Sequence, residues 1–253
     1  MNNTEKFTGK AIDYDKYRPN YPQALYNDII LKASLTDKNV IADIGAGTGK
    51  FSLPLLKAAY KVYCIEPNAD MKERMDKNLS AFDGYIGLNA TAEDTTLPIN
   101  SVDCIVVAQA FHWFNREFFR LECRRILKPQ GKVFLIWNTR DEKAQSTQEL
   151  YAVNKKYCPN FKGFSGGVEL ADKNQFNDFF KNGNCTVQIY NNDVFYDSVE
   201  SFVGRTLSSS YALKSSNNGF DEYVGELKSI YNKYADCNGF ALKHKTVVFY
   251  GEV

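Results

Sequence analysis

The stretch VIADIGAGTGKF, residues 40–51, decides the fold of this chain. Its first five residues form an apolar run that predicts a buried strand. Glycines follow at positions 45, 47 and 49, where they permit a sharp turn and a close approach of a ligand to the main chain. A Walker loop requires GxxxxGK(S/T), and a dinucleotide fold would carry Gly or Ala where this chain has Lys50. The GxGxG spacing instead favours a compact nucleoside with an amino-acid tail.

Strand patterns and helix patterns alternate through the first half of the chain, which predicts an α/β fold with a mostly parallel sheet and helices on both faces. Asn68 is placed to cap one of these helices. Another helix is expected to carry Phe118, Leu121, Ile126 and Leu127 on or near one face, and the KPQG sequence at 128–131 should end it. The expected strands are 40–44, 61–67, 84–90, 101–110 and 131–138, and the expected helices are 51–59, 68–79 and 115–127.

The character of the sequence changes after residue 140. Helical patterns lie at 141–157, 199–207 and 221–235, and strand patterns lie at 185–198 and 242–252. We find no internal repeat and no low-complexity linker. We therefore expect one domain over residues 1–253, with a core at 1–140 and a small cap built from insertions at 141–180 and 199–236.

Composition sets limits on the class of protein. Lys and Arg number 31 against 30 Asp and Glu, a net charge of +1, so no overall basic field indicates nucleic-acid binding. The six cysteines are scattered without a CxxC pair, which favours reduced, mostly buried thiols over a disulfide framework. The N-terminal residues are polar, and no apolar run is long enough to cross a bilayer. We expect a cytoplasmic protein with no membrane partner, and the sequence leaves its oligomeric state open.

Two carboxylates accompany the glycine turn. Asp43 lies two residues before Gly45, and Glu66 stands at the end of the second expected strand, 21 residues after Gly45. A carboxylate in the position of Glu66 accepts hydrogen bonds from ribose hydroxyls, as in dinucleotide-binding folds. Glu66 therefore fixes a nucleoside without choosing the cofactor.

Further segments of the sequence indicate which cofactor is bound. TAEDTTLP at 91–98, VAQAFHWF at 107–114 and RRILKPQGKVFLIWN at 124–138 follow the glycine motif in order, with YDKYRPNYP at 14–22 before it and SFVGRTLSSSYA at 201–212 after it. This ordered set resembles the class I S-adenosylmethionine-dependent methyltransferases, in the type 11 group and near its trans-aconitate methyltransferase-like branch. The resemblance implies a Rossmann-like sheet of seven strands, the last antiparallel and inserted beside the fifth.

The resemblance also implies a site for S-adenosylmethionine. The methionine tail would lie along the glycine turn, Glu66 would hold the ribose, and the segment after the second strand would flank the adenine. The adenine edge would meet the loop after the third strand, and an N-terminal segment would close over the site. The implied cofactor residues are Tyr17, Arg18, Asp43, Gly45, Ala46, Gly47, Thr48, Glu66, Pro67, Asn68, Met71, Ala92, Glu93 and Gln109.

Candidates for the substrate side follow the fourth strand and the later helices. His112 stands just beyond the fourth strand, at the edge where open α/β sheets bind ligands, and could act as a general base; alternatively, FHWF is an aromatic wall. His244 alternates with apolar residues and is expected on a solvated strand face. Possible substrate contacts are Trp113, Arg140, Arg205, Ser208, Ser209 and Tyr211.

Two reaction classes are disfavoured. Metal-dependent methylation of catechols needs a carboxylate cluster after the fourth strand, where this chain has Gln109, Ala110 and Phe111, so no metal is expected. The (N/D/S)PP(Y/F/W) motif of base-methylating DNA enzymes is also absent, which argues against a nucleic-acid substrate.

The sequence therefore predicts an S-adenosylmethionine-dependent methyltransferase that acts on a small molecule. Arg18, Arg140 and Arg205 come from three segments that the fold would bring towards one edge, and they favour a carboxylic acid as acceptor. Two alternatives stay open. One is a cofactor-binding protein without transfer activity, and the other, disfavoured by Lys50, is an NAD(P)-dependent oxidoreductase.

Overall fold

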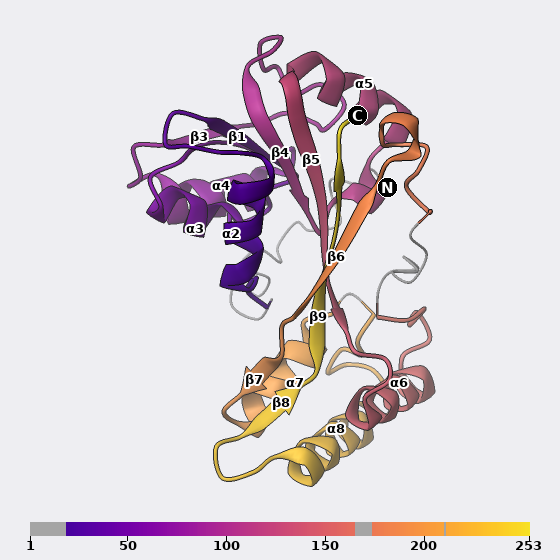
Figure 1. Cartoon of the computed structure of the whole chain (residues 1–253). Coiled ribbons are helices and arrows are strands. Elements are labelled where there is room, and N and C mark those ends of the chain that lie inside the picture. The colour runs from indigo at the N-terminus through magenta and orange to yellow at the C-terminus, as the bar shows by residue number, and fades with distance from the viewer. Residues whose placement is uncertain (1–18, 165–173, 210) are drawn as a thin grey trace.

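The computed structural model describes residues 19–164, 174–209 and 211–253. Its main body is a seven-stranded sheet with strand order β3-β2-β1-β4-β5-β9-β6, drawn in the upper part of Figure 1. The first five strands are parallel, and β9 pairs antiparallel with both β5 and β6. This confirms the predicted fold class, including a last strand inserted beside the fifth. The strands are β1 Val40–Ile44, β2 Lys61–Ile65, β3 Tyr85–Leu88, β4 Val102–Ala108, β5 Leu127–Arg140, β6 Thr186–Asn191 and β9 His244–Gly251.

Helices cover both faces of this sheet, as expected for parallel strands with apolar side chains on both sides. Apolar side chains of α2 (Gln23–Lys32), α3 (Ser52–Lys57) and α4 (Ala69–Leu79) form the core on one face. On the other face, α5 (Arg116–Ile126) packs together with phenylalanines 176, 179 and 180. The Asn68 side chain accepts a hydrogen bond from the Met71 main-chain nitrogen at 3.0 Å, so the predicted cap of α4 is confirmed.

Half of the face predicted for α5 is wrong, since Ile126 and Leu127 are buried but the other two residues are not. Phe118 and Leu121 are 58% and 54% exposed, and the buried side chains are Phe119, Glu122, Cys123 and Ile126. The true face includes a carboxylate, which a pattern of apolar residues alone does not reveal. The helix ends at Ile126, one residue before the predicted end, but the KPQG sequence that follows lies within β5, which begins at Leu127. Gln130 of that sequence takes a φ of +66°, where the pairing of β4 with β5 shifts register.

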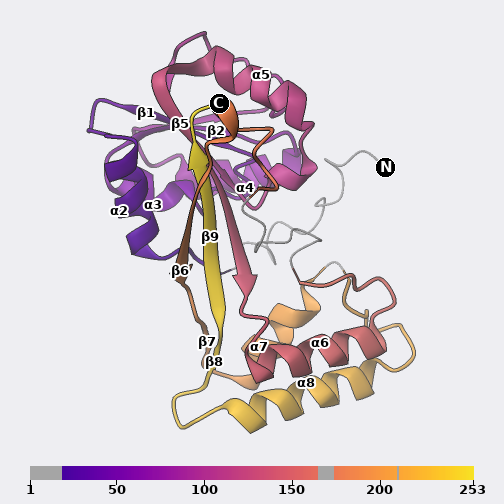
Figure 2. The same ribbon diagram turned by 45° about the vertical axis from the view of Figure 1, so that its right-hand side comes forward.

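A second group of elements lies below the sheet, and we call it the lower lobe. It contains α6 (Gln145–Tyr157), α7 (Val199–Leu207), α8 (Phe220–Tyr234) and a two-stranded sheet of β7 (Val194–Tyr196) and β8 (Phe240–Leu242). Figure 2 shows the long strands β5 and β9 running from the main sheet down to this lobe. The lobe has its own apolar cluster, with Tyr223 and Leu227 of α8 at its centre.

The segment predicted as one strand at 185–198 is two strands in different sheets, because β6 pairs with β9 and β7 pairs with β8. Two short 3-10 helices, η2 (Phe111–Trp113) and η3 (Lys181–Gly183), complete the described elements. Within the described ranges, the helices are too short or too polar to cross a membrane.

Candidate functional site

The turn after β1 gives its three glycines different tasks. Gly45, Gly47 and Gly49 have φ values of +71°, +59° and +79°, a region that side chains disfavour. A Cβ on Gly45 would lie 2.5 Å from the Cβ of Ala110, and one on Gly49 would overlap Leu79 of α4. A Cβ on Gly47 would meet nothing within 4 Å. Gly45 and Gly49 are therefore required by packing, and Gly47 borders open space.

Glu66 closes this turn from the end of β2. Its Oε2 accepts a hydrogen bond from the Gly47 nitrogen and its Oε1 accepts one from the Asn68 nitrogen, both at 2.9 Å. The side chain is 8% exposed, and burial raises the pKa of its carboxyl despite these two donors. A carboxylate has about four lone-pair positions, so Glu66 can still accept hydrogen bonds from ligand hydroxyls.

Asp43 lies beneath the turn at the end of β1 and is fully buried. Its Oδ2 accepts a hydrogen bond from the Ser52 hydroxyl at 2.6 Å, whereas Oδ1 has no partner among the described residues. Burial, and to a lesser degree the charge of Glu66, raises the pKa of Asp43 to about 7. An unpartnered buried carboxylate oxygen is costly, and a cationic ligand would satisfy it.

The remaining wall of this region comes from the segments after β2 and β3. Pro67 is half-buried, Asn68 and Met71 are buried, and Met71 therefore packs in the structure under the start of α4. Sequence reasoning missed Asn89, whose side-chain amide donates to the carbonyls of Glu66 and Pro67 at 3.2 Å. Its position at the end of the third strand was the available signal.

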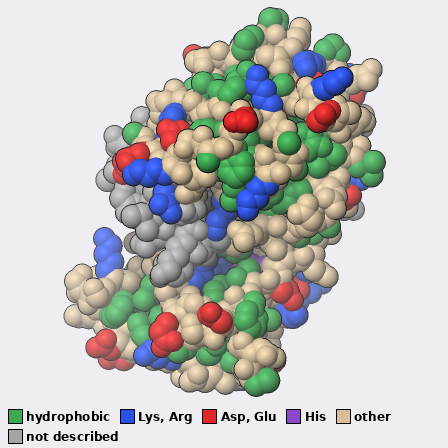
Figure 3. Space-filling view, turned by 90° about the vertical axis from the view of Figure 1, so that its left-hand side faces the viewer, with side chains coloured by type: hydrophobic (Ala, Val, Ile, Leu, Met, Phe, Trp, Pro, Cys, Tyr) green, Lys and Arg blue, Asp and Glu red, His purple; other side chains and the backbone are tan. Residues whose placement is uncertain are grey.

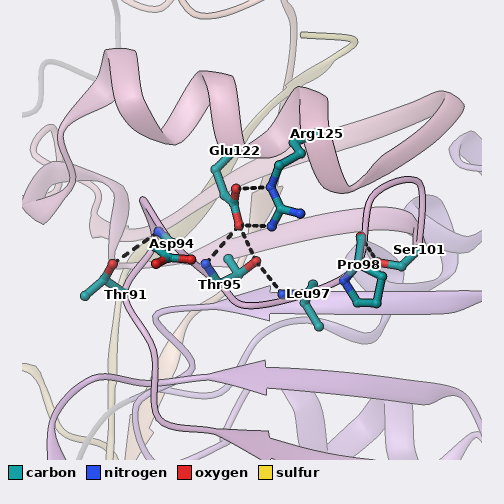
Figure 4. Close-up of polar contacts among 8 residues, drawn as sticks. All are labelled: Thr91, Asp94, Thr95, Leu97, Pro98, Ser101, Glu122 and Arg125. Atoms are coloured by element: carbon teal, nitrogen blue, oxygen red, sulfur yellow. Dashed lines mark hydrogen bonds and ion pairs between the residues drawn. The ribbon is translucent and has the colours of Figure 1, made fainter.

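The loop at 91–98 is held against α5 by a buried carboxylate. Figure 4 shows Glu122 accepting hydrogen bonds from the main chain and the hydroxyl of Thr95, with the main-chain bond at 2.8 Å, while Arg125 pairs with the same carboxylate at 2.7 Å. These bonds hold the pKa of Glu122 below its usual range against the opposing effect of burial. Glu122 was missed because its role needs a partner 27 residues away.

The loop at 91–98 also contains two predicted cofactor residues. Ala92 is buried, and Glu93 accepts a hydrogen bond from the Asn115 nitrogen at 2.7 Å. Asn115 caps α5. Glu93 therefore ties the loop to the start of α5, and its second carboxylate oxygen is the one available for an adenine edge.

Gln109 follows the end of β4 and donates hydrogen bonds to the neighbouring strand β5. Gln109 takes a φ of +61°; its nitrogen donates to Ile136 at 2.8 Å and its side-chain amide donates to the Asn138 carbonyl at 2.9 Å. His112 follows in η2 and is exposed, with its ring 4.7 Å from that of Trp113. Phe111 is 1% exposed and belongs to the core. We call the region formed by the turn at 45–49 and the ends of β2, β3 and β4 the cofactor edge.

The other predicted substrate residues lie at the lower lobe. Arg140 ends β5 and Arg205 lies on α7, and they are 8% and 6% exposed. Arg205 donates to the Ser209 hydroxyl at 3.4 Å, and the Ser208 hydroxyl donates to the Arg205 carbonyl at 2.8 Å. The hydroxyl of Tyr211 is buried without a hydrogen-bond partner among the described residues. Tyr17 and Arg18 lie outside the described residues.

The prediction that His244 faces solvent is wrong. His244 is 4% exposed, and its Nδ1 lies 3.0 Å from the Leu242 carbonyl. It begins β9 opposite Arg140 of β5, where the lower lobe covers the strands, so alternation along the strand does not identify a solvated face. Burial, together with the charges of Arg140 and Arg205, lowers its pKa to about 3.

Comparison with known proteins agrees with this geometry. The family model described as a methyltransferase domain matches residues 42–135. An uncharacterized methyltransferase of Mycobacterium tuberculosis is 35% identical over 143 residues, 56% of each chain. A protein of Saccharomyces cerevisiae named a probable S-adenosylmethionine-dependent methyltransferase is 33% identical over 134 residues, 51% of this chain and 45% of its own. The chain thus matches about half the length of these curated relatives.

One solved structure resembles nearly the whole chain. It belongs to a protein of Anaeromyxobacter dehalogenans assigned as a type II methyltransferase, with a TM-score of 0.66, 19% identity, and coverage of 93% of this chain and 98% of that one. Residues 42–135 therefore resemble a methyltransferase domain in sequence, and the chain shares the Rossmann-like fold of that solved structure.

Proposed function

We propose that this protein transfers a methyl group from S-adenosylmethionine to a small molecule. The observation that carries the proposal is the pairing of open space at Gly47 with a buried, unpartnered carboxylate oxygen on Asp43. S-adenosylmethionine carries an ammonium and a sulfonium, and both are cations that such a site suits. The pyrophosphate of NAD is an anion that an ionised Asp43 would repel, which disfavours the oxidoreductase alternative.

Each residue of the cofactor edge would contact a particular part of S-adenosylmethionine. Asp43 and the turn at Gly45 to Gly47 would hold the amino-acid tail, with Ala46 and Thr48 in the same turn. Glu66 would accept hydrogen bonds from the ribose hydroxyls, and Asn68 and Met71 would flank the adenine. Ala92 and Glu93 would approach the adenine edge, and Gln109 would lie near the tail. The N-terminal residues Tyr17 and Arg18 would complete this set.

In methyl transfer, the main task of the protein is to position the acceptor atom next to the methyl group. The bound cofactor supplies a methyl group whose bond to sulfur breaks with the electron pair remaining on sulfur, while the acceptor atom forms the new bond. The chain must align the acceptor atom with that bond and exclude water. A carboxylate acceptor needs no base at neutral pH. For a hydroxyl acceptor, the exposed His112 is the candidate base.

For the acceptor we propose a small carboxylic acid, with Trp113, Arg140, Arg205 and Tyr211 as its contacts. The support is the burial of two arginines at the lower lobe, because guanidinium groups pair bidentately with carboxylates. The absence of a DNA-methylase motif in the sequence further supports a small molecule over a nucleic acid.

A screen with labelled S-adenosylmethionine tests the proposal. Purified protein is incubated with matched panels of carboxylic acids, neutral alcohols and amines, and transfer of label is followed. We expect transfer to at least one acid. Transfer only to neutral or cationic compounds would contradict the acid, and cofactor binding without any transfer would favour the alternative of a binding protein.

A further inference from the structure

Arg140 is a buried cation that forms no ion pair with the residues the structure describes. The residue is 8% exposed, and its Nε has no hydrogen-bond partner within the described ranges. The carbon at the centre of its guanidinium lies 4.1 Å from the ring centroid of Phe164. Such stacking recovers only part of the cost of burying a cation. An arriving anion would recover more.

A second guanidinium shares this region. Arg205 is 6% exposed on α7, and both Arg205 and Arg140 lie close enough to His244 for their charges to lower the pKa of its imidazole. His244 is therefore neutral at physiological pH and adds no charge. In the space-filling view, Lys and Arg side chains lie at the hollow between the upper and lower parts of the molecule (Figure 3).

The described acid that acts on His244 is engaged elsewhere. Asp193 raises the pKa of His244, but its carboxylate pairs with Lys243 at 2.6 Å. The buried hydroxyl of Tyr211 is unpartnered among the described residues and lies near Tyr223, whose pKa is influenced by both Tyr211 and Arg140. The region thus combines buried cations with a hydroxyl donor, which is the composition of an anion site.

The fold sets this region apart from the cofactor edge. The Gln109 nitrogen donates to Ile136, and Arg140 lies four residues further along β5, a span of about 13 Å at 3.3 Å per residue. The guanidinium stacks on Phe164, which packs against the apolar cluster of the lower lobe. Arg140 therefore reaches towards the lobe and away from the turn at Gly47.

We propose that Arg140, with Arg205 and Tyr211, binds a carboxylate of the acceptor that is not the methylated group. This rests on the proposed function and narrows it to a bifunctional acceptor, with a carboxylate at one end and a methyl-accepting oxygen several bonds away. That oxygen belongs to a hydroxyl or to a second carboxylate. When a hydroxyl is methylated, the methyl replaces its proton, which passes to water or to a base.

Calorimetry tests the anion site separately from methyl transfer. Dicarboxylates from malonate to adipate are titrated into wild-type protein, both alone and saturated with S-adenosylhomocysteine. We expect at least one to bind, and Arg140→Gln to weaken that binding about tenfold or more, the scale of a lost charge-assisted hydrogen bond, with S-adenosylhomocysteine binding unchanged. Lys243→Gln is the matched control, because it removes a neighbouring, 57% exposed cation and should bind dicarboxylates like wild type.

Two measurements separate a binding role from a structural one. Because Arg140 has no ion pair to lose among the described residues, Arg140→Gln should unfold at the wild-type temperature or above it without ligand. Arg140→Lys keeps the charge but lacks the planar fork, so it should bind the dicarboxylates with intermediate affinity. Equal dicarboxylate binding by wild type and both variants, or no binding of any dicarboxylate to wild type, would overturn the anion site. Failure of S-adenosylhomocysteine to bind would instead refute the proposed function.

The chemical identity of the methylated product tests whether the acceptor is bifunctional. Mass spectrometry after turnover with hydroxy acids and dicarboxylates should find products that keep one free carboxylate. Methyl esters formed from simple monocarboxylates, at rates unaffected by Arg140→Gln, would overturn it.

Discussion

The cofactor edge and the lower lobe both bury charged side chains, but of opposite sign. At the cofactor edge the buried groups are Asp43 and Glu66, and at the lower lobe they are Arg140 and Arg205. Burial raises the pKa values of both acids. The two arginines are also buried, so a ligand of opposite charge would be favoured in each region. The proposed function uses this difference, with the cationic cofactor at the acidic region and an anionic acceptor at the basic one.

The largest expected effect comes from the open space at the glycine turn. Gly47→Val would place a branched side chain where the amino-acid tail is proposed to lie, and equilibrium dialysis with labelled S-adenosylhomocysteine should detect no binding. Gly183→Val is the control, because Gly183 has a similar φ of +70° and its nearest Cβ neighbour would be 3.7 Å away. Normal binding by folded Gly47→Val protein would remove the glycine turn from the cofactor site.

The next effect concerns the ribose. Glu66→Ala should weaken S-adenosylhomocysteine binding by about 1.5–3 kcal/mol, the scale of hydrogen bonds to a charged group. The ligand-induced rise in unfolding temperature should shrink accordingly. Glu73→Ala provides a control, since Glu73 is exposed and pairs with Lys77 on α4. An unchanged rise in the folded Glu66 variant would show that the ribose lies elsewhere.

The charge of Asp43 predicts opposite pH trends for binding and stability. Its pKa is raised from 3.8 to about 7 by folding, so the folded protein keeps a proton that the unfolded chain loses. The stability contributed by Asp43 is greatest below pH 4 and is lost as pH rises towards 7. Binding of the cationic cofactor should strengthen about tenfold from pH 6 to pH 8, as the carboxylate ionises. Asp43→Asn should flatten both trends, and a wild-type affinity independent of pH would contradict this role.

The smallest effect on binding is expected in the loop held by Glu122. Thr95 is fully buried, and Thr95→Val keeps its shape while removing the hydroxyl that donates to Glu122. Chemical denaturation should show a loss of about 1.5–3 kcal/mol, with only a modest loss of cofactor affinity. Thr91→Val, at an exposed threonine of the same loop, should change stability less. Equal stability of the Thr95 variant and wild type would mean that Glu122 does not anchor the loop.

The turn, strand ends and helix cap of the cofactor edge could be predicted from sequence because their signals are local, and their role in binding a cofactor stays a prediction. The apolar run before Gly45, the acid at the end of β2 and the cap at Asn68 each depend on residues close together in the chain. The strand order required the family resemblance, because periodicity does not say which strands pair. The individual tasks of the glycines also needed the structure, since Gly45 and Gly49 contact residues of distant elements.

The lower lobe could not be predicted in the same detail, because burial there depends on contacts between distant segments. His244 alternates with apolar residues like a surface strand position, yet the lobe covers it. Phe118 is exposed on α5 while Glu122 is buried there, where it accepts a hydrogen bond from Thr95 in another loop. Arg140 is a candidate from sequence, but its sequence context does not show that it is buried and forms no ion pair with the described residues.

Titration calorimetry with S-adenosylhomocysteine tests the central claim most directly. We expect one binding site per chain on the wild-type protein, and NAD should not compete for it. Gly47→Val should lose this site. Absence of binding to folded wild-type protein, or displacement of S-adenosylhomocysteine by NAD, would contradict it.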